Sequence, residues 1–338
     1  AWMQIVRSPH ANARIRRIDV DAARSAPGVL SVLTGSDYEA EGCGTSAIDF
    51  LNIKGGVFRY REGKELFLPE NSVLATERVR FVGDAIVLVI AETTHQALDA
   101  AEMVEIEFEP LASVVHAVAA READAPPVWD EASDNVCADV EYGDETACNS
   151  AFAEADHVVR IDVVNNRVIL NPMEPRGAIG DYDNETGVYT VYNTSQIPHR
   201  TKTMLADEVF RVAGDKVRVI CKDMGGGFGG RGSPYPEYLF VAWCAKRLGR
   251  PIKWICERSE GFLTDTHGRD NVSHAELALD GEGRFLALRV STIANMGAYP
   301  NRLGPMVPVV LGPRVQTTVY TIPVLYSRIR VALSLIHI

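Results

Sequence analysis

The glycine-rich stretch DMGGGFGGRG (223–232) constrains this chain more than any other segment. Five glycines and one phenylalanine fill the six positions from Gly225 to Gly230. Glycine loses more conformational freedom on folding than any other residue, so such a run is favourable only where the backbone needs positive φ or where another group approaches closely. We therefore expect an irregular loop with at least one glycine at positive φ.

The glycine run lies between a predicted strand, 216–222, and a predicted helix, 236–248, that starts at a proline and stops before a glycine. Backbone amides at such a junction can bind an anion. A P-loop is excluded, because Arg231 and Gly232 stand where Lys and Ser or Thr are required. The run satisfies G-x-G-x-x-G, and Glu257 ends the next strand, so a dinucleotide-binding loop stays open. A structural glycine turn also stays open.

Composition narrows the class of protein. The chain has 338 residues, 46% hydrophobic and 23% charged, as in a soluble globular protein of two or three domains. Its net charge of −11, without a basic patch, argues against a nucleic-acid partner. No apolar run reaches the roughly 18 residues that predict a membrane span. The six cysteines form no C-x-x-C pair, which predicts no zinc or iron–sulfur site and a cytoplasmic protein with reduced thiols.

Hydrophobic periodicity predicts two α+β units. Residues 1–112 alternate strands with short helices, including a helix over 93–104, and are irregular over 36–70. Residues 113–144 are acidic and contain Pro126-Pro127, which predicts a linker or a long surface loop. Residues 145–338 contain a second set of strands and helices. Its apolar segments MVPVVLG (306–312) and IRVALSLIHI (329–338) are predicted as strands without partners in the chain.

Five blocks of sequence, in order, carry a resemblance to a known family. They are RSPHANARIRRIDVDAARSAPGVLSVLTGSD, LATERVRFVGDAIVLVIAETTHQALDAAEMVEIEFEPL, NPMEPRGAIGDYD, TSQIPHRTK and GGGFGGRG. Together they resemble the catalytic large subunit of the molybdenum hydroxylase family, which includes xanthine dehydrogenase, aldehyde oxidase and aerobic carbon monoxide dehydrogenase. The resemblance implies an α+β fold, with an α/β hammerhead domain at 1–112 and the first part of a mixed α+β molybdopterin-binding domain at 145–338.

The resemblance also implies a molybdenum–pyranopterin cofactor, in a dinucleotide form if the protein is bacterial, with no protein ligand to the metal. Its binding residues would be Gly225, Gly226, Gly227, Phe228, Gly229, Gly230 and Arg231, with the amides of Gly226, Gly227, Gly229 and Gly230 as donors. Gln196 and Phe228 match catalytic positions: a glutamine that hydrogen-bonds an oxygen ligand of molybdenum, and a phenylalanine beside the metal. Alternatively, Gln196 is a cap or surface residue and Phe228 anchors the loop in the core.

Other polar residues have structural and catalytic interpretations side by side. Glu174 and Arg176 in NPMEPRG are predicted to form a buried ion pair, and Glu174 is also a candidate base. His199 and His267 are further candidates, although a single histidine is usually a structural residue.

The resemblance implies oxidation of an aldehyde, an N-heterocycle or carbon monoxide with oxygen from water. Electrons would pass to an iron–sulfur small subunit with [2Fe–2S] clusters and a medium subunit with FAD, in a dimer of heterotrimers. Gly232 stands where purine-oxidising members carry a glutamate, which disfavours a purine. The catalytic glutamate is expected beyond residue 338, so this stretch is expected to be an inactive fragment, or a scaffold or binding part. Residues Ser334 to Ile338 depart from the family's usual continuation.

Overall fold

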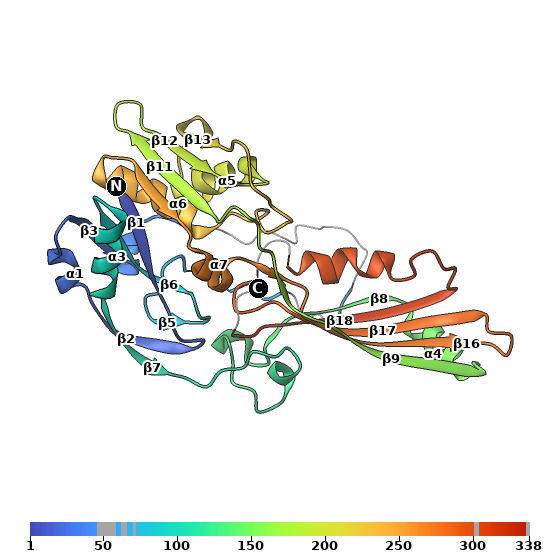
Figure 1. Cartoon of the computed structure of the whole chain (residues 1–338). Helices are drawn as coiled ribbons and strands as arrows, with labels where there is room; N and C mark the ends of the chain where they lie inside the picture. The colour runs from blue at the N-terminus through green and yellow to red at the C-terminus, as the bar shows by residue number, and fades with distance from the viewer. Residues whose placement is uncertain (46–58, 62–65, 70–71, 301–303, 336–338) are drawn as a thin grey trace. The chain divides into compact units, whose positions relative to one another are not determined.

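The computed structural model describes residues 1–45, 59–61, 66–69, 72–300 and 304–335. Its α-helices are α1 (Asp21–Ser25), α2 (Gly35–Ala40), α3 (Thr94–Glu102), α4 (Glu145–Ala153), α5 (Pro198–Thr203), α6 (Pro236–Leu248) and α7 (Arg258–Thr264). Its strands are β1 (Trp2–Arg7), β2 (Ala13–Asp19), β3 (Val29–Thr34), β4 (Arg59–Tyr60), β5 (Arg78–Val79), β6 (Ala85–Ala91), β7 (Glu105–Pro110), β8 (Val136–Gly143), β9 (His157–Asn165), β10 (Val168–Ile169), β11 (Gly177–Asp183), β12 (Val188–Asn193), β13 (Val217–Ile220), β14 (Ile252–Ile255), β15 (His267–Gly268), β16 (Asn271–Leu279), β17 (Phe285–Asn295) and β18 (Val324–Ala332). This mixture of helices and sheets confirms the predicted α+β class (Figure 1).

Within these ranges, no helix combines the length and the apolar character that crossing a membrane requires. The chain divides into two compact units, and each is built from segments that are distant in sequence.

The first unit contains the described residues of 1–47, 70–112 and 169–266. Its larger sheet has seven strands in the order β13-β12-β11-β14-β1-β6-β3, and a smaller one has the order β5-β2-β7. β1 joins the two halves of the larger sheet, because it is antiparallel to β6 and parallel to β14. All seven residues of β6, AIVLVIA, are buried, which suits a strand covered on both faces.

Helix α6 packs on β11, β12 and β14 of this sheet. Its sequence is apolar almost all round, so it is buried from Glu237 to Ala245. Pro236 occupies the first turn, where a missing N–H costs little, and Gly249 ends the helix with φ +61°. The helix predicted over 236–248 is therefore confirmed. It fixes the point at which the glycine-rich loop ends.

The division of the chain differs from the predicted one. The sequence suggested separate units at 1–112 and 145–338, but strands from both ranges share the seven-stranded sheet. The N-terminal amino group of Ala1 donates to the carbonyl of Pro251 at 2.8 Å, across 250 residues of sequence. A pairing over that separation leaves no local pattern, so the sequence did not show that strands on both sides of residue 112 share one sheet.

The second unit is built on a six-stranded sheet in the order β4-β8-β18-β17-β16-β9. Helix α4 packs against β17 and β18. A π-helical segment, Val307–Leu311, contributes Val309 and Val310 to a core shared with Ile329 and Val331 of β18. β16 and β17 form an antiparallel hairpin, with alternating apolar residues on both strands and a turn that contains Gly281 and Gly283.

The predicted linker, 113–144, is instead a packed part of the second unit. Its last residues form β8, which pairs with β18. Trp129 is buried and its indole N–H donates to the carbonyl of Ala298 at 2.8 Å. Asn135 is fully buried at φ +52°, and its side chain accepts from the amide of Val128 at 2.8 Å. The acidic, proline-containing composition of this segment comes from its solvent-exposed residues. Its few buried residues were therefore not recognised in the sequence.

Three further expectations were wrong. Residues 306–312 form the π-helical segment and not a strand. β18, expected to be unpaired, is parallel to β17 on one side and antiparallel to β8 on the other. Residues 36–70 were expected to be irregular, but helix α2 occupies their first residues; about half of this range lies outside the described residues. Of residues 334–338, Ser334 and Leu335 are buried, and the amide of Leu335 donates to Val114 at 2.8 Å; residues 336–338 lie outside the described ranges.

Candidate functional site

The glycine-rich loop follows β13 and leads into α6, as the sequence predicted. It has no regular structure, and Gly226 and Gly229 have φ of +110° and +93°. Phe228 also has positive φ, +49°. A non-glycine residue rarely takes this conformation, so the surrounding contacts must hold the loop in it.

Protein side chains, packed against the loop, explain three of its glycines. A Cβ at Gly225 would lie 2.5 Å from Cβ of Glu174, and one at Gly227 would lie 2.7 Å from Cδ of Gln196. A Cβ at Gly230 would lie 3.1 Å from a methyl carbon of Leu170. The close approach that the glycine run predicted is thus made, on this side of the loop, by the chain itself.

Some backbone amides of the loop donate hydrogen bonds within the protein. The others, called open amides below, donate to no described residue. The amide of Gly225 donates to the carboxylate of Glu174 at 2.6 Å, and that of Gly229 donates to Oε1 of Gln196 at 2.9 Å. The amide of Gly230 donates to the carbonyl of Gly227. By contrast, the amides of Gly226, Gly227 and Phe228 donate to no residue that the structure describes. Of the four amides expected to be available, those of Gly229 and Gly230 are therefore already occupied.

Gln196 lies between β12 and α5, directly against the loop. Its backbone amide donates to the carbonyl of Arg231 at 3.0 Å, while its side-chain oxygen is taken by Gly229. With Oε1 used in this way, the side-chain NH₂ group is left as a donor, and it has no acceptor among the described residues. The predicted proximity of Gln196 to the loop is confirmed.

Phe228 extends outward from the loop. Its side chain is 73% exposed, so it does not anchor the loop in the core. The ring lies close to its own loop, because a Cβ added to Gly226 would be 3.0 Å from a carbon of the Phe228 ring. The structure thus places an uncovered aromatic ring beside three open amides.

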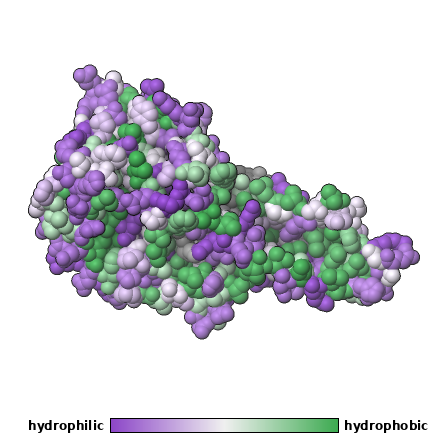
Figure 2. Space-filling model, viewed as in Figure 1, coloured by the Kyte–Doolittle hydropathy of each residue, from purple (hydrophilic) through white to green (hydrophobic). Residues whose placement is uncertain are grey.

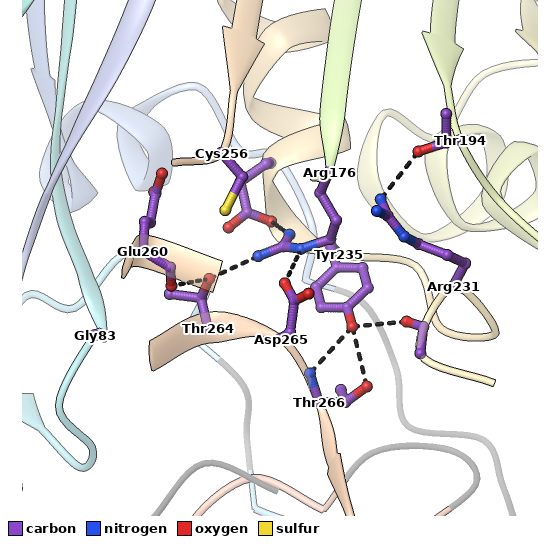
Figure 3. Close-up of polar contacts among 12 residues, drawn as sticks. Gly83, Arg176, Thr194, Arg231, Tyr235, Cys256, Glu260, Thr264, Asp265 and Thr266 are labelled. Atoms are coloured by element: carbon purple, nitrogen blue, oxygen red, sulfur yellow. Dashed lines mark hydrogen bonds and ion pairs between the residues drawn. The ribbon is translucent and has the colours of Figure 1, made fainter. Parts of the chain in front are cut away.

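Arg231 fastens the loop from the buried side. It is 1% exposed, and its guanidinium donates to Oγ1 of Thr194 at 2.9 Å (Figure 3). It also donates to the carbonyl of Glu174 at 2.5 Å. Its Nε has no hydrogen-bond partner, and no carboxylate in the described part of the chain pairs with it. A buried cation held only by neutral oxygens leaves positive charge beneath the loop, which favours an anion there.

The predicted Glu174–Arg176 ion pair is wrong. Glu174 binds the loop amide of Gly225, whereas Arg176 donates to Glu237 at 2.6 Å and to Asp265 at 2.5 Å. The guanidinium of Arg176 also lies 3.8 Å from the ring centroid of Tyr235 (Figure 3). Glu174 and Arg176 are two residues apart on an irregular segment, and their side chains reach different surroundings.

The partners of Arg176 form a buried charge network that the sequence analysis missed. Arg7 of β1 donates to Glu237 and to Glu260, each at 2.7 Å. Burial alone would raise the pKa of Glu237, but Arg176 and Arg7 lower it to about 2. The available signal was a glutamate in the first turn of the very apolar helix PEYLFVAWCAKRL. This network joins β1, the residue directly before β11, α6 and α7.

A pocket of about 360 Å³ lies next to these residues. Its lining includes Glu174, Thr194, Lys222 and Asp223, together with residues of β11, β12 and β14. His199 is exposed on α5 and makes no polar contact with the loop, and His267 is half-buried in β15. The described residues contain no group of three or more His, Cys, Asp or Glu side chains that could hold a metal ion.

Comparison of the chain with known proteins identifies its family. Residues 128–334 match the family model of the molybdopterin cofactor-binding domain, and residues 1–112 match that of the aldehyde oxidase and xanthine dehydrogenase a/b hammerhead domain. The chain belongs to the molybdenum hydroxylase family of large subunits. The molybdopterin cofactor-binding model spans the GGGFGG run, so the match gives no support to the dinucleotide-binding alternative.

Relatives and solved structures agree with the family. The chain is 34% identical over 305 residues to the 6-hydroxypseudooxynicotine dehydrogenase complex subunit gamma of Paenarthrobacter nicotinovorans, covering 90% of this chain and 37% of that protein. It is 32% identical over 309 residues to the carbon monoxide dehydrogenase large chain of Hydrogenophaga pseudoflava, covering 88% and 36%. The chain thus spans little more than a third of these relatives. Quinoline 2-oxidoreductase from Pseudomonas putida 86 matches its structure with a TM-score of 0.87 and 33% identity, over 99% of this chain and 41% of that one.

Proposed function

We propose that this chain forms the cofactor-binding part of a molybdenum hydroxylase that oxidises an aldehyde, an N-heterocycle or carbon monoxide. The observation that supports this most is the set of three open amides, at Gly226, Gly227 and Phe228, beside the unused NH₂ group of Gln196. These are four hydrogen-bond donors at one loop, with no metal-ligating side chain among them. Such a site suits a group that brings its own metal and presents hydrogen-bond acceptors.

The residues at the loop fit a molybdenum–pterin group. When bound, that group supplies the redox centre that takes electrons from the substrate. The open amides would bind its acceptor atoms, and the buried charge of Arg231 would favour its anionic parts. Gln196 would donate from Nε2 to an oxygen acceptor, because its Oε1 is held by Gly229. Phe228 would cover the site with an apolar ring and exclude water from it.

The substrate proposal rests on Gly232 and on the relatives. Glycine at 232 offers no side chain that could bind a polar purine ring, which disfavours purines. Relatives at 28–34% identity are named for nicotine derivatives, quinoline and carbon monoxide, whereas those named for hypoxanthine and xanthine are 25–27% identical. An N-heterocycle or another small substrate without a purine's polar edge is consistent with both.

We further propose that electrons leave through partner subunits. The described residues hold no cluster-binding set of side chains, and the relatives are named as a complex subunit and a large chain. An iron–sulfur subunit and an FAD subunit would then complete the enzyme, as a dimer of heterotrimers in the cytoplasm.

A matched pair of glycine variants tests the proposal. Gly226→Ala places a methyl group at φ +110° and within 3.1 Å of Phe228 and Pro172, whereas Gly214→Ala meets nothing within 4 Å. Both are made in the complete protein, in a host that produces the cofactor, and molybdenum content and dye-linked oxidation are measured. We expect Gly226→Ala to lose molybdenum and Gly214→Ala to retain it. Full metal content in Gly226→Ala would overturn the assignment of the loop. Full metal content in the unmodified protein without turnover of any of the three substrate classes would favour a binding role.

A further inference from the structure

Tyr235 contacts the glycine-rich loop from the buried side. Its hydroxyl donates to the carbonyl of Gly230 at 2.7 Å, and this bond uses the one proton of the hydroxyl, because a carbonyl can only accept. The hydroxyl oxygen then accepts from the amide of Thr266 at 3.1 Å and from the hydroxyl of Thr266 at 3.0 Å (Figure 3). The donor and both acceptor positions of the hydroxyl are therefore occupied, which leaves it a single orientation.

The ring of Tyr235 is also fixed in place. The guanidinium of Arg176, which is completely buried in the charge network described above, lies 3.8 Å from the ring centroid. Tyr235 directly precedes Pro236, and a residue before proline is restricted to the extended backbone that Tyr235 has, with φ −92° and ψ 150°. Tyr235, Gly230 and Arg176 are buried, so these contacts lie beneath the surface that Figure 2 shows and do not depend on what covers that surface.

The carbonyl that Tyr235 binds belongs to a strained turn of the loop. The amide of Gly230 donates to the carbonyl of Gly227 at 2.9 Å, which closes a four-residue turn. Its two central residues, Phe228 and Gly229, have φ of +49° and +93°, as the central residues of a type I′ turn do. A phenylalanine at positive φ is strained, so this turn keeps its conformation only if contacts from outside hold it.

Two side chains hold the turn, each at a different peptide group. Oε1 of Gln196 accepts from the amide of Gly229 at 2.9 Å, and the hydroxyl of Tyr235 donates to the carbonyl of Gly230. The open amides of this turn lie between the same two residues that its hydrogen bond closes, so their direction depends on both contacts. Gln196 keeps an NH₂ group for a ligand, whereas every position of the Tyr235 hydroxyl is used within the protein.

We propose that Tyr235 is a positioning residue. Through the carbonyl of Gly230 it fixes the turn 227–230 in the conformation that presents the open amides of Gly227 and Phe228. The inference rests on the proposed function where it assigns those amides to the cofactor. Its structural part, control of the loop conformation by one buried hydroxyl, is independent of that function.

A pair of tyrosine variants tests the structural part. Tyr235→Phe removes the hydroxyl and keeps the ring on Arg176. Tyr142→Phe is the matched control, because Tyr142 is also buried and its hydroxyl also donates to a backbone carbonyl, that of Val309 in the second unit. The readout is hydrogen–deuterium exchange of peptides over 223–232, in the complete protein from a host that lacks the cofactor. Exchange should rise roughly fivefold in Tyr235→Phe and stay at the wild-type rate in Tyr142→Phe.

Molybdenum content tests the link to the cofactor. In a host that makes the cofactor, Tyr235→Phe should retain at most about half the wild-type molybdenum, because fewer molecules hold the binding conformation. Tyr142→Phe should retain all of it. Circular dichroism checks folding; Thr266→Val, which keeps Tyr235 and removes one partner of its hydroxyl, should also raise loop exchange and serves if Tyr235→Phe does not fold.

The outcomes separate this inference from the proposed function. Equal loop exchange in Tyr235→Phe and Tyr142→Phe would overturn the positioning role. Faster loop exchange with full molybdenum content in Tyr235→Phe would overturn the link between the turn and the cofactor. If the unmodified protein bound no molybdenum, the proposed function would fail, and the exchange rates would still decide whether Tyr235 holds the loop.

Discussion

The side-chain oxygen of Gln196 accepts a hydrogen bond from the amide of Gly229 at 2.9 Å. This single contact determines which end of the carboxamide is available for a ligand. It orders the loop through Oε1 and leaves the NH₂ group as a donor. The two roles can be separated, because a carboxylate keeps the acceptor and loses the donor.

Gln196→Glu should therefore keep the loop in place and reduce turnover of the complete enzyme. Loss of one donor to a developing negative charge typically lowers kcat by roughly 10²–10³-fold, and the added negative charge acts in the same direction. The measurement is kcat together with molybdenum content, with Gln196→Ala as the variant that loses both roles. Wild-type kcat in Gln196→Glu would show that Nε2 contributes nothing to the reaction.

Gly227 and Gln196 should be energetically coupled. Alanine at 227 brings a methyl group to 2.7 Å from Cδ of Gln196, which must then move. In Gln196→Ala that atom is absent, so Gly227→Ala should cost less there than in the wild type. Neighbouring residues show coupling energies of about 0.5–3 kcal/mol. Denaturant unfolding of the two single variants and the double variant measures it; additive effects would mean that the contact is not what requires glycine.

Arg176→Met should be strongly destabilising. The side chain of Arg176 is completely buried between Glu237 and Asp265, so its removal leaves buried negative charge unpaired. Breaking a buried ion pair from one side typically costs about 3–5 kcal/mol of unfolding free energy. Arg250→Ala, at an exposed pair with Glu92, is the control and should leave the unfolding midpoint unchanged. Equal effects of the two changes would contradict this account.

Ionisation of Asp84 should lower the free energy of unfolding as the pH rises from about 4 to about 7. Burial raises the pKa of Asp84 from 3.8 to about 7, although the amide of Arg80 donates to it. Below about pH 4 the carboxyl is protonated in both the folded and the unfolded chain, so the folded state bears no penalty. Between about pH 4 and 7 the unfolded chain releases the proton first, so stability declines until the folded pKa is passed. Asp84→Asn should flatten this part of the curve of unfolding free energy against pH. A variant with the wild-type slope would exclude Asp84 as its source.

Substrate profiling tests the role of Gly232. The complete enzyme should oxidise xanthine or hypoxanthine with a kcat/KM about 10²-fold below that of its preferred aldehyde or N-heterocycle. A site that lacks a partner for a polar group of the substrate discriminates by about this factor. Comparable values for xanthine would remove the argument from residue 232.

Local sequence patterns predicted the features that depend on residues close together in the chain, namely helix ends and loop conformation. Pro236 and Gly249 gave the ends of α6, and the glycine run gave an irregular loop with positive φ. The proximity of Gln196 to that loop came from the family resemblance. Its hydrogen-bond partner did not, because only the folded backbone decides which amides are used.

The sequence did not predict contacts between residues that are far apart along the chain. The partners of Arg176 come from α6 and from the end of α7, and nothing in NPMEPRG favours them over Glu174. The segment 306–312 is apolar and short, and such a run is compatible with a strand or with a helix until its neighbours are known. The packed segment around Trp129 was missed for a related reason, since buried residues are few among many charged ones.

The parallel pairing of β1 with β14 also sets an order of events during synthesis. The ribosome releases Trp2–Arg7 long before Ile252–Ile255, so the seven-stranded sheet cannot close until most of this sequence has emerged. Until then one side of β1 stays open, and contacts over such sequence separations form slowly. Translation stalled before residue 255 should therefore leave a nascent chain whose first strand is accessible to chaperones and proteases.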